Sequence, residues 1–176
     1  MGFHVSWITI RGIAPEAVRE QLQLRETGER EELPESDIAE ALLPSGWQLI
    51  FFNDPCPEEI EDKNLKALSA GCEVMAFVVE ECSMTTLAMS YVNGDSVWHV
   101  AHDSDSGLEH MEVTGTPPVC FSEIYSKLLA ELKADENPCD YLFDVPAELS
   151  KVLTGFRHDC DIEGADGDVF SILEKT

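Results

Sequence analysis

The feature that most constrains the fold is a series of short strand-like segments in the middle of the chain. Cys72–Glu80, Met84–Val92 and Ser96–His102 are rich in β-branched and aromatic residues, a composition typical of strands. Asn93-Gly94 joins the second and third segments, and both residues tolerate the positive φ that the tightest hairpin turns require. A further strand-like segment, Leu108–Thr114, follows a short turn. Together these segments predict an antiparallel meander.

Segments on either side of the meander predict the rest of the architecture. Apolar and β-branched residues favour strands over Phe3–Ile10 and Gly46–Asn53, and apolar residues at helical spacing favour a helix over Cys120–Ala134. The remaining predictions are a helix from Pro15, a helix within Pro57–Ser69, an exposed connection over Glu29–Glu40 with a helical turn at Asp37–Leu43, a helix over Pro146–Leu153 ended by Gly155, and a strand or helix over Asp168–Leu173.

The length of the chain and the order of its elements predict the fold class. The chain has 176 residues, of which 44% are hydrophobic, which suits one domain with a substantial core. No internal repeat or flexible linker divides the sequence. We therefore expect residues 1–176 to form a single globular domain of the α+β class, with a mostly antiparallel β-sheet, a central meander and helices packed on one face.

The charge of the chain is its second informative feature. Lysine and arginine number 11 against 35 aspartate and glutamate residues, for a net charge of −24. No lysine or arginine lies between Lys66 and Lys127, although this stretch carries nine carboxylates. Because the same stretch contains the predicted meander, its carboxylates should stand on strands and tight turns. An ordered acidic surface of this kind suits a basic partner.

The same charge excludes several classes of function. Nucleic-acid binding depends on lysine and arginine to neutralise phosphates, and anionic membranes repel an acidic surface. The longest apolar stretches, around Trp47–Phe52 and Val74–Val79, are far shorter than the ~20 residues of a membrane-spanning helix. The amino terminus has no signal-peptide pattern. We expect a cytoplasmic protein that binds neither nucleic acid nor membrane, and its oligomeric state stays open.

The cysteines predict neither a disulfide framework nor a zinc site. They are widely scattered, with no C-x-x-C pair and no grouping with histidine at zinc-finger spacing. We interpret most of them as free thiols, with Cys72 and Cys120 in apolar surroundings where cysteine acts as a small core residue. We expect no bound metal and no cofactor.

Histidine and aspartate occur together in two segments. His99 and His102 are three residues apart on a predicted strand, so they point to opposite faces and do not share a metal. The segment around His158 and Asp159 also contains a cysteine and a second aspartate, but Asp-rich segments of this kind more often form polar loops. If folding brought His102, Asp103, His158 and Asp159 together, a metal-dependent hydrolase would be the alternative function.

Other catalytic motifs are missing from the sequence. It contains no G-x-S-x-G nucleophile elbow, no phosphate-binding loop with its lysine and no dinucleotide-binding glycine pattern. Serine and cysteine occur in quantity, but their presence alone indicates no activity. We therefore expect that the protein is not an enzyme.

Several short motifs carry a resemblance to known proteins. They are Gly46-Trp47, Glu80–Met84, Asn93-Gly94, Trp98-His99-Val100, His102-Asp103, Asp144-Val145-Pro146, Thr154-Gly155-Phe156 and His158-Asp159. In these motifs the chain resembles an uncharacterised family of small acidic bacterial proteins, to which no established activity is attached. In size, acidity and lack of catalytic motifs it is similar in general style to bacterial toxin-immunity proteins.

Charge and resemblance together predict a binding function. We expect an acidic protein that binds a basic partner, an immunity protein that occludes the active site of a bacterial toxin such as a nuclease. A DNA mimic that inhibits a DNA-binding protein is an alternative, and it would need long, regular rows of carboxylates. The candidate partner-binding residues stand at predicted strand ends and turns, and they are Glu80, Glu81, Asp95, Asp103, Asp105 and Glu109.

Overall fold

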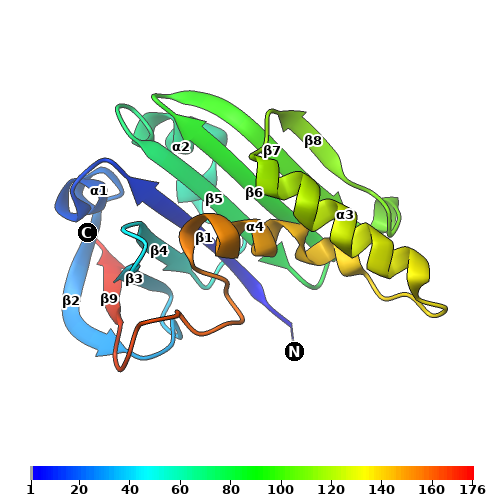
Figure 1. Ribbon diagram of the computed structural model, residues 1–176. Coiled ribbons are helices and arrows are strands. Elements are labelled where there is room, and N and C mark those ends of the chain that lie inside the picture. The colour runs from blue at the N-terminus through cyan, green and yellow to red at the C-terminus, as the bar shows by residue number, and fades with distance from the viewer. Residues whose placement is uncertain (1) are drawn as a thin grey trace.

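Nine strands form one sheet in which every neighbouring pair is antiparallel. The computed structural model describes residues 2–176, and within them the strand order is β2-β9-β3-β4-β1-β5-β6-β7-β8 (Figure 1). The strands are β1 His4–Arg11, β2 Leu24–Glu31, β3 Ile38–Leu42, β4 Gln48–Phe52, β5 Glu73–Glu80, β6 Thr85–Val92, β7 Asp95–Asp103, β8 Glu112–Gly115 and β9 Phe170–Lys175. The sheet therefore contains strands from both ends of the chain, and the α+β class is confirmed.

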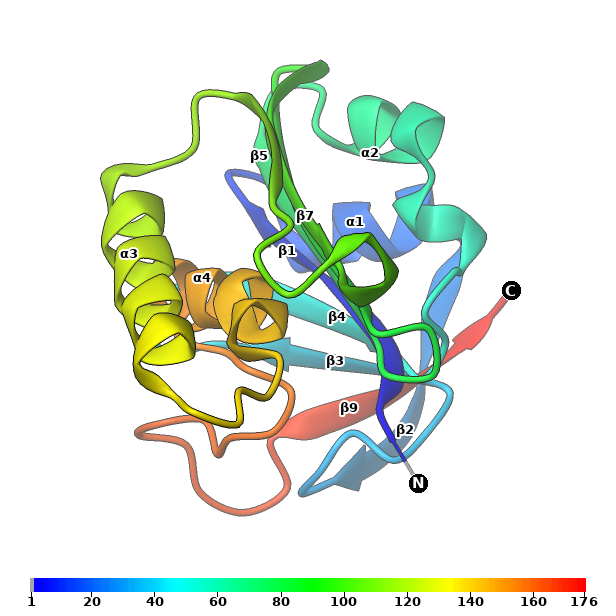
Figure 2. The ribbon, with the colours of Figure 1, turned by 90° about the vertical axis from the view of Figure 1, so that its right-hand side faces the viewer.

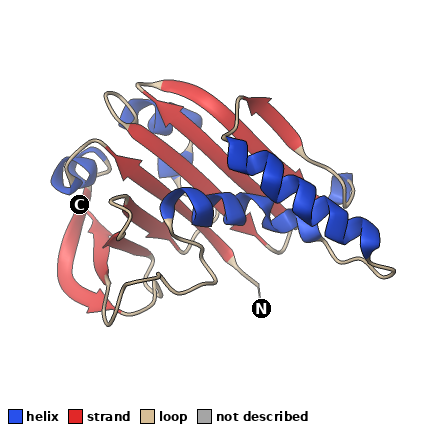
Figure 3. Ribbon diagram, in the orientation of Figure 1, coloured by secondary structure: helices blue, strands red, loops and turns tan. Residues whose placement is uncertain are grey.

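Four α-helices and three short 3-10 helices lie within the described residues (Figure 3). They are α1 Pro15–Gln21, α2 Asp62–Leu68, α3 Val119–Ala134 and α4 Val145–Thr154, with η1 Glu58–Ile60, η2 Ser104–Ser106 and η3 Tyr141–Asp144. All four predicted helices are confirmed. Gly155 ends α4 at φ 83°, a left-handed conformation that glycine adopts without steric cost.

The predicted meander is confirmed as β5, β6, β7 and β8. Asn93 and Gly94 connect β6 to β7 with φ of 52° and 86°, the two positive values of a type I′ turn. The turn sets a register in which Val92 pairs with Asp95. The last strand, β8, pairs with β7 alone and has every residue exposed, so it forms one edge of the sheet.

Helices cover both faces of the sheet, as Figure 2 shows with the sheet seen from its side. Side chains alternate along a strand, and in β1 Trp7 belongs to the core under α3 and α4 while Ile8 belongs to the core under α1 and α2. Val18 of α1 and Leu65 of α2 are completely buried in this second core. The expectation that helices pack on one face therefore holds only for α3 and α4, because the two short helices supply enough apolar surface to cover the other.

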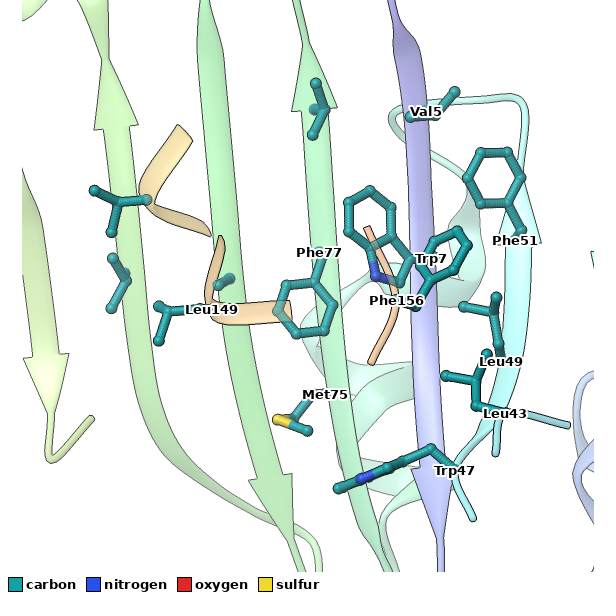
Figure 4. Packing of buried hydrophobic residues seen from close by; sticks show 14 of the residues in the cluster. Val5, Trp7, Leu43, Trp47, Leu49, Phe51, Met75, Phe77, Leu149 and Phe156 are labelled. Carbon is teal, nitrogen blue, oxygen red and sulfur yellow. The ribbon is translucent and has the colours of Figure 1, made fainter. Parts of the chain in front are cut away.

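Trp7 is the centre of the larger core (Figure 4). Its ring stacks on Phe77 with centroids 5.4 Å apart and meets Phe156 edge-on at 5.5 Å, geometries that add to the burial energy. Its indole N–H donates to Ser150 Oγ of α4 at 2.9 Å, so no polar group of the ring is left unsatisfied. These contacts hold β1 firmly between β4 and β5 and fix the position of its first residue, His4.

The charged segment before β4 differs from its prediction. Instead of an exposed connection, residues 24–31 form β2 and residues 38–42 form β3. The predicted helical turn at Asp37–Leu43 is wrong, because β3 lies between β4 and β9 and buries Ala39 and Glu40. The buried Glu40 carboxylate accepts hydrogen bonds from Arg19 at 2.6 Å and Gln48 at 2.5 Å. At the carboxyl end, where a strand or a helix was predicted, residues 170–175 form the strand β9.

Candidate functional site

Five of the six carboxylates selected from the sequence lie at one end of the sheet. The Cα register aligns Glu80 of β5 with Asp103 of β7, through Thr85 of the strand between them. Glu81 follows Glu80 in the β5–β6 turn, and the other two acids follow Asp103 in the connection to β8. We call Glu80, Glu81, Asp103, Asp105 and Glu109 the acidic end.

Asp95 is the exception among the predicted residues. It is the first residue of β7, next to the Asn93-Gly94 turn, whereas Asp103 is the last residue of the same strand. Eight residues of strand separate the two, on the order of 25 Å at ~3.3 Å per residue. The structure therefore does not bring Asp95 together with the acidic end.

The turns that carry the acidic end are ordered by their own hydrogen bonds. Asp103 caps η2 by accepting from the backbone N–H of Asp105 and from Ser106 Oγ, each at 3.0 Å. Glu81 accepts from the backbone N–H of Phe3 at 3.0 Å. Glu109 lies 3.6 Å from Lys133 of α3, and both side chains are more than half exposed, so this pair neutralises little of the local charge.

His102 is a buried structural residue. Its side chain is 0% exposed, its Nε2 lies 2.9 Å from Asp140, and its Nδ1 lies 2.7 Å from the backbone oxygen of His110. Ser104 also donates to the Asp140 carboxylate. A catalytic triad has its nucleophile and its carboxylate on opposite nitrogens of the imidazole, whereas Ser104 and Asp140 both face Nε2. The group therefore links η2 to η3 and has no free nitrogen for chemistry.

His158 lies in an aromatic environment. Its ring centroid is 4.6 Å from that of Phe3 and 5.5 Å from that of Trp7. Burial lowers the pKa of His158, because desolvation disfavours the imidazolium. Beside it, burial tends to raise the pKa of Asp159, but its hydrogen bonds to Arg157 lower that pKa overall. His158 is thus a neutral packing residue, and Asp159 is one of the carboxylates that hold Arg157.

The four residues of the hydrolase alternative do not converge. His158 packs on Trp7 of β1, and His102 lies on β7. Three strand spacings separate β1 from β7, roughly 14 Å at ~4.8 Å each. First-shell ligands lie only about 2.0–2.6 Å from a metal, so these two histidines cannot share one, and we do not carry this alternative further.

A different group of side chains converges at a place that no sequence motif indicates. Within residues 2–176, His4, Glu80 and Cys82 are the one set of three potential ligands whose atoms all lie within 4.8 Å of one another. His4 Nδ1 lies 2.5 Å from Glu80 Oε1, and His4 Nε2 lies 3.5 Å from Cys82 Sγ. The histidine and the carboxylate are direct cross-strand neighbours in β1 and β5. They are 76 residues apart in sequence, so spacing could not reveal the group.

His4 also lines a cavity on the face of the sheet that carries α1 and α2. The cavity has a volume of about 770 Å³ and an apolar floor of Ile38, Phe52 and Leu173. Its rim is mostly acidic, and the charged residues that line it are Asp37, Asp54, Glu58, Glu59, Glu174 and Lys175. Lys175 lies 3.3 Å from Glu58 and 3.0 Å from Glu59, so the cavity favours a neutral or cationic occupant.

All six cysteines within the described residues are free, whereas the sequence predicted free thiols for most of them. Cys72 is buried and Cys120 is partly buried, and burial raises the pKa of both thiols, since desolvation disfavours the thiolate. The other four thiols are exposed, and they are Cys56, Cys82, Cys139 and Cys160.

Comparisons with protein-family models, curated proteins and solved structures gave no match for this chain. Among the helices of residues 2–176, none combines the length and the apolar character needed to cross a membrane.

Proposed function

We propose that this protein is a cytoplasmic binding protein for a basic partner, and specifically an immunity protein that occludes the active site of a basic bacterial toxin such as a nuclease. The observation that carries the proposal is the acidic end itself. Its five carboxylates come from turns that adjoin one another at a single end of the sheet, within the stretch that has no lysine or arginine. An electropositive active-site cleft would be attracted to this surface.

The arrangement of the acidic end suits recognition by charge. Carboxylates gathered on one surface steer a basic partner and raise its association rate. Because the turns are ordered by internal hydrogen bonds, little conformational entropy would be lost on binding. Electrostatic attraction alone gives fast association with fast dissociation, so a tight complex also needs apolar contacts.

Two exposed apolar side chains adjoin the acidic end and can provide those contacts. Leu108, which is 37% exposed, lies between Asp105 and Glu109 in the chain. Phe3, which is 43% exposed, is tied to Glu81 through its backbone N–H. Apolar residues surrounded by charges are the usual anatomy of a protein interface.

The grouping of the carboxylates favours an immunity protein over a DNA mimic. A mimic needs carboxylates in long rows that follow the spacing of phosphates, whereas an inhibitor of one cleft needs one compact patch. The acidic end is a patch of turns, and Asp95 at the far end of β7 is too distant to extend it into a continuous row.

Affinity capture with charge-neutralised variants tests the proposal. The first variant changes Glu81→Gln, Asp103→Asn, Asp105→Asn and Glu109→Gln. The matched control makes the same change in net charge at exposed positions that are not part of the acidic end, with Glu29→Gln, Asp95→Asn, Glu163→Gln and Asp166→Asn. We expect the wild type and the control, but not the first variant, to retain a basic protein from a lysate of the source organism at 150 mM salt.

The captured protein must then be a toxin whose activity the purified chain inhibits, and cells that lack the gene must become sensitive to that toxin. If the control variant fails to capture the protein to the same extent as the first variant, then net charge, not the acidic end, is responsible for capture. Absence of any basic toxin, together with unchanged sensitivity of the deletion strain, would contradict the proposal.

A further inference from the structure

We propose that Cys82 is a catalytic nucleophile, with His4 as its general base and Glu80 as the carboxylate that orients the base, and that the group cleaves esters or thioesters. This activity goes beyond the proposed binding function and does not depend on it. The contacts run in one chain, from Cys82 Sγ to His4 Nε2 at 3.5 Å and from His4 Nδ1 to Glu80 Oε1 at 2.5 Å.

The hydrogen bonds decide the tautomer of His4. An ionised carboxylate only accepts hydrogen bonds, so His4 Nδ1 must carry the proton that lies toward Glu80. In the neutral ring this leaves the lone pair of Nε2 facing the thiol of Cys82. An imidazole that donates to a carboxylate through one nitrogen and faces a nucleophile with the other has the arrangement of a hydrolytic triad.

Glu80 also positions the nucleophile. Its Oε1 atom accepts a second hydrogen bond, from the backbone N–H of Cys82 at 3.0 Å. One carboxylate oxygen thus ties the base and the residue that bears the thiol together. Because His4 and Glu80 are paired residues of two central strands, the sheet fixes their relative position, and such rigid support keeps reacting groups in productive geometry.

A metal site is the competing explanation for these three residues. Metal ligands must all point to one centre, but the two nitrogens of His4 point to different partners, and one of them is used by Glu80. This leaves His4 Nε2 and Cys82 Sγ as two protein ligands, fewer than the three or four of typical zinc sites. The linear order of thiol, imidazole and carboxylate therefore favours proton transfer over metal binding.

The other exposed thiols lack this environment. Cys160 Sγ lies 3.9 Å from Lys151 Nζ and 3.7 Å from Asp159, and within the described residues no imidazole is hydrogen-bonded to the thiol of Cys56 or Cys139. Glu80 Oε1 lies 2.5 Å from His4 Nδ1, where a carboxylate stabilises the positive charge that the ring carries while it holds the proton of Cys82. Transfer from Cys82 to His4 therefore produces an ion pair that the local charge partly supports.

The reaction divides into two balanced steps. In the first, Cys82 Sγ adds to the carbonyl carbon while its proton moves to His4 Nε2; the bond to the leaving oxygen or sulfur breaks, and the leaving group takes that proton. In the second, His4 removes a proton from water, the hydroxide adds to the thioester carbon, and the carbon–sulfur bond breaks. The thiol regains its proton from His4, and a carboxylic acid is released.

We place part of the substrate in the cavity that His4, but not Cys82, lines. Its apolar floor and acidic rim suit an ester or thioester that has an apolar part and a cationic group. A substrate of this kind is attracted by the same carboxylates that disfavour anions.

Alkylation by iodoacetamide, followed by peptide mass spectrometry, tests the reactivity of the thiol on the full chain. At pH 7 we expect Cys82 to react about tenfold faster than Cys139, since His4 Nε2, 3.5 Å from Cys82 Sγ, can accept the thiol proton as the sulfur reacts. His4→Gln should reduce the Cys82 rate to that of Cys139, and Glu80→Gln should reduce it in part. Cys139 is the internal standard, because it is an exposed thiol of the same chain.

Acyl transfer is tested with 4-nitrophenyl acetate and then with acetylthiocholine, a cationic thioester. We expect a burst of nitrophenolate, an acetyl group on the Cys82 peptide, and turnover of acetylthiocholine at least about tenfold above that of Cys82→Ser, consistent with general acid–base assistance. Cys139→Ser is the matched control that should behave as the wild type. Near-ultraviolet circular dichroism confirms that each variant is folded.

Two results would overturn the assignment. Equal alkylation rates and pH profiles for Cys82 and Cys139, unchanged by His4→Gln, would mean that His4 does not activate the thiol. Submicromolar binding of Zn²⁺ in calorimetry, removed by both Cys82→Ser and His4→Gln, would identify a metal site in place of a nucleophile. Neither result would affect the proposed binding function, because the capture experiment does not change Cys82 or His4.

Discussion

Two histidine–carboxylate pairs lie at the same end of the sheet and differ in their surroundings. His102 and Asp140 have side chains 0% and 8% exposed, whereas the side chains of His4 and Glu80 are 40% and 23% exposed. The buried pair has both imidazole nitrogens and the carboxylate occupied by protein partners. In the open pair, one nitrogen of His4 faces only the thiol of Cys82.

The comparison teaches that residue type does not separate structure from chemistry. Most buried polar groups are hydrogen-bonded within the protein, and the buried pair of His102 and Asp140 follows this rule, so it has no nitrogen left with which to react. In a pair at the surface, one imidazole nitrogen can stay without a protein partner and face a substrate, since water satisfies its hydrogen bond when no substrate is bound. In the sequence, His102 and Asp103 were candidates only for the alternative hydrolase, whereas the histidine with a nitrogen that faces a thiol is His4.

The largest expected difference between the pairs is in stability. Asp140→Ala leaves His102 buried without its carboxylate and should lower the free energy of unfolding by about 3–5 kcal/mol. Glu80→Ala removes a partly exposed partner of the more exposed His4 and should lower it by less than about 1 kcal/mol. Urea unfolding followed by tryptophan fluorescence measures both. Equal losses would mean that the two pairs play the same role and would invalidate the comparison.

A third histidine extends the comparison to a buried imidazole with no carboxylate partner. Burial lowers the pKa of His158, so below its ordinary pKa of about 6.5 the unfolded chain binds a proton that the folded chain resists. Stability should therefore fall as the pH decreases from 7 to 5, by at most about 1.4 kcal/mol per pH unit for one group. Asp159 contributes at lower pH, because its lowered pKa gives stability that is lost only as its carboxylate is protonated.

The variant His158→Phe checks this expectation. Phenylalanine keeps the ring contacts with Phe3 and Trp7 but has no nitrogen that can bind a proton. The slope of stability against pH between 5 and 7 should therefore be smaller than in the wild type. Urea unfolding at several pH values gives both slopes. An unchanged slope would assign the pH dependence to other groups and would remove His158 from the comparison.

Strong local signals in the sequence were enough to predict most of the fold. Asn93-Gly94 alone fixed a hairpin, and the apolar spacing of residues 120–134 fixed α3, since both depend on neighbours in the chain. β2 was missed because it is an edge strand with six consecutive exposed residues. Since neither of its faces is buried there, its sequence shows no alternation of apolar and polar residues. β3 was missed because Glu40, buried with Arg19 and Gln48, has the charge of a surface residue.

The candidate sites divide in the same way. Residues 80–81 and 103–109 were selected because they stand at predicted strand ends and turns, and in the structure five of the six predicted carboxylates lie at one end of the sheet. His4 was not selected, because its partners are set by the pairing of β1 with β5, which depends on the whole core around Trp7. The local sequence pattern around His4 does not indicate which distant strand will pair with β1.

The smallest expected effect is the coupling within the open pair, and salt should separate it from the buried one. A double-mutant cycle with His4→Ala and Glu80→Ala should give a coupling of about 0.5 kcal/mol at low salt. At 1 M salt the Debye length falls to about 3 Å, so this coupling should nearly vanish, because both side chains are accessible to ions. The cycle for His102 and Asp140 should change little with salt, since no solvent reaches their contact. A His4–Glu80 coupling as large and as insensitive to salt as the buried one would mean that Glu80 holds His4 rigidly, and its role would then be structural as well as catalytic.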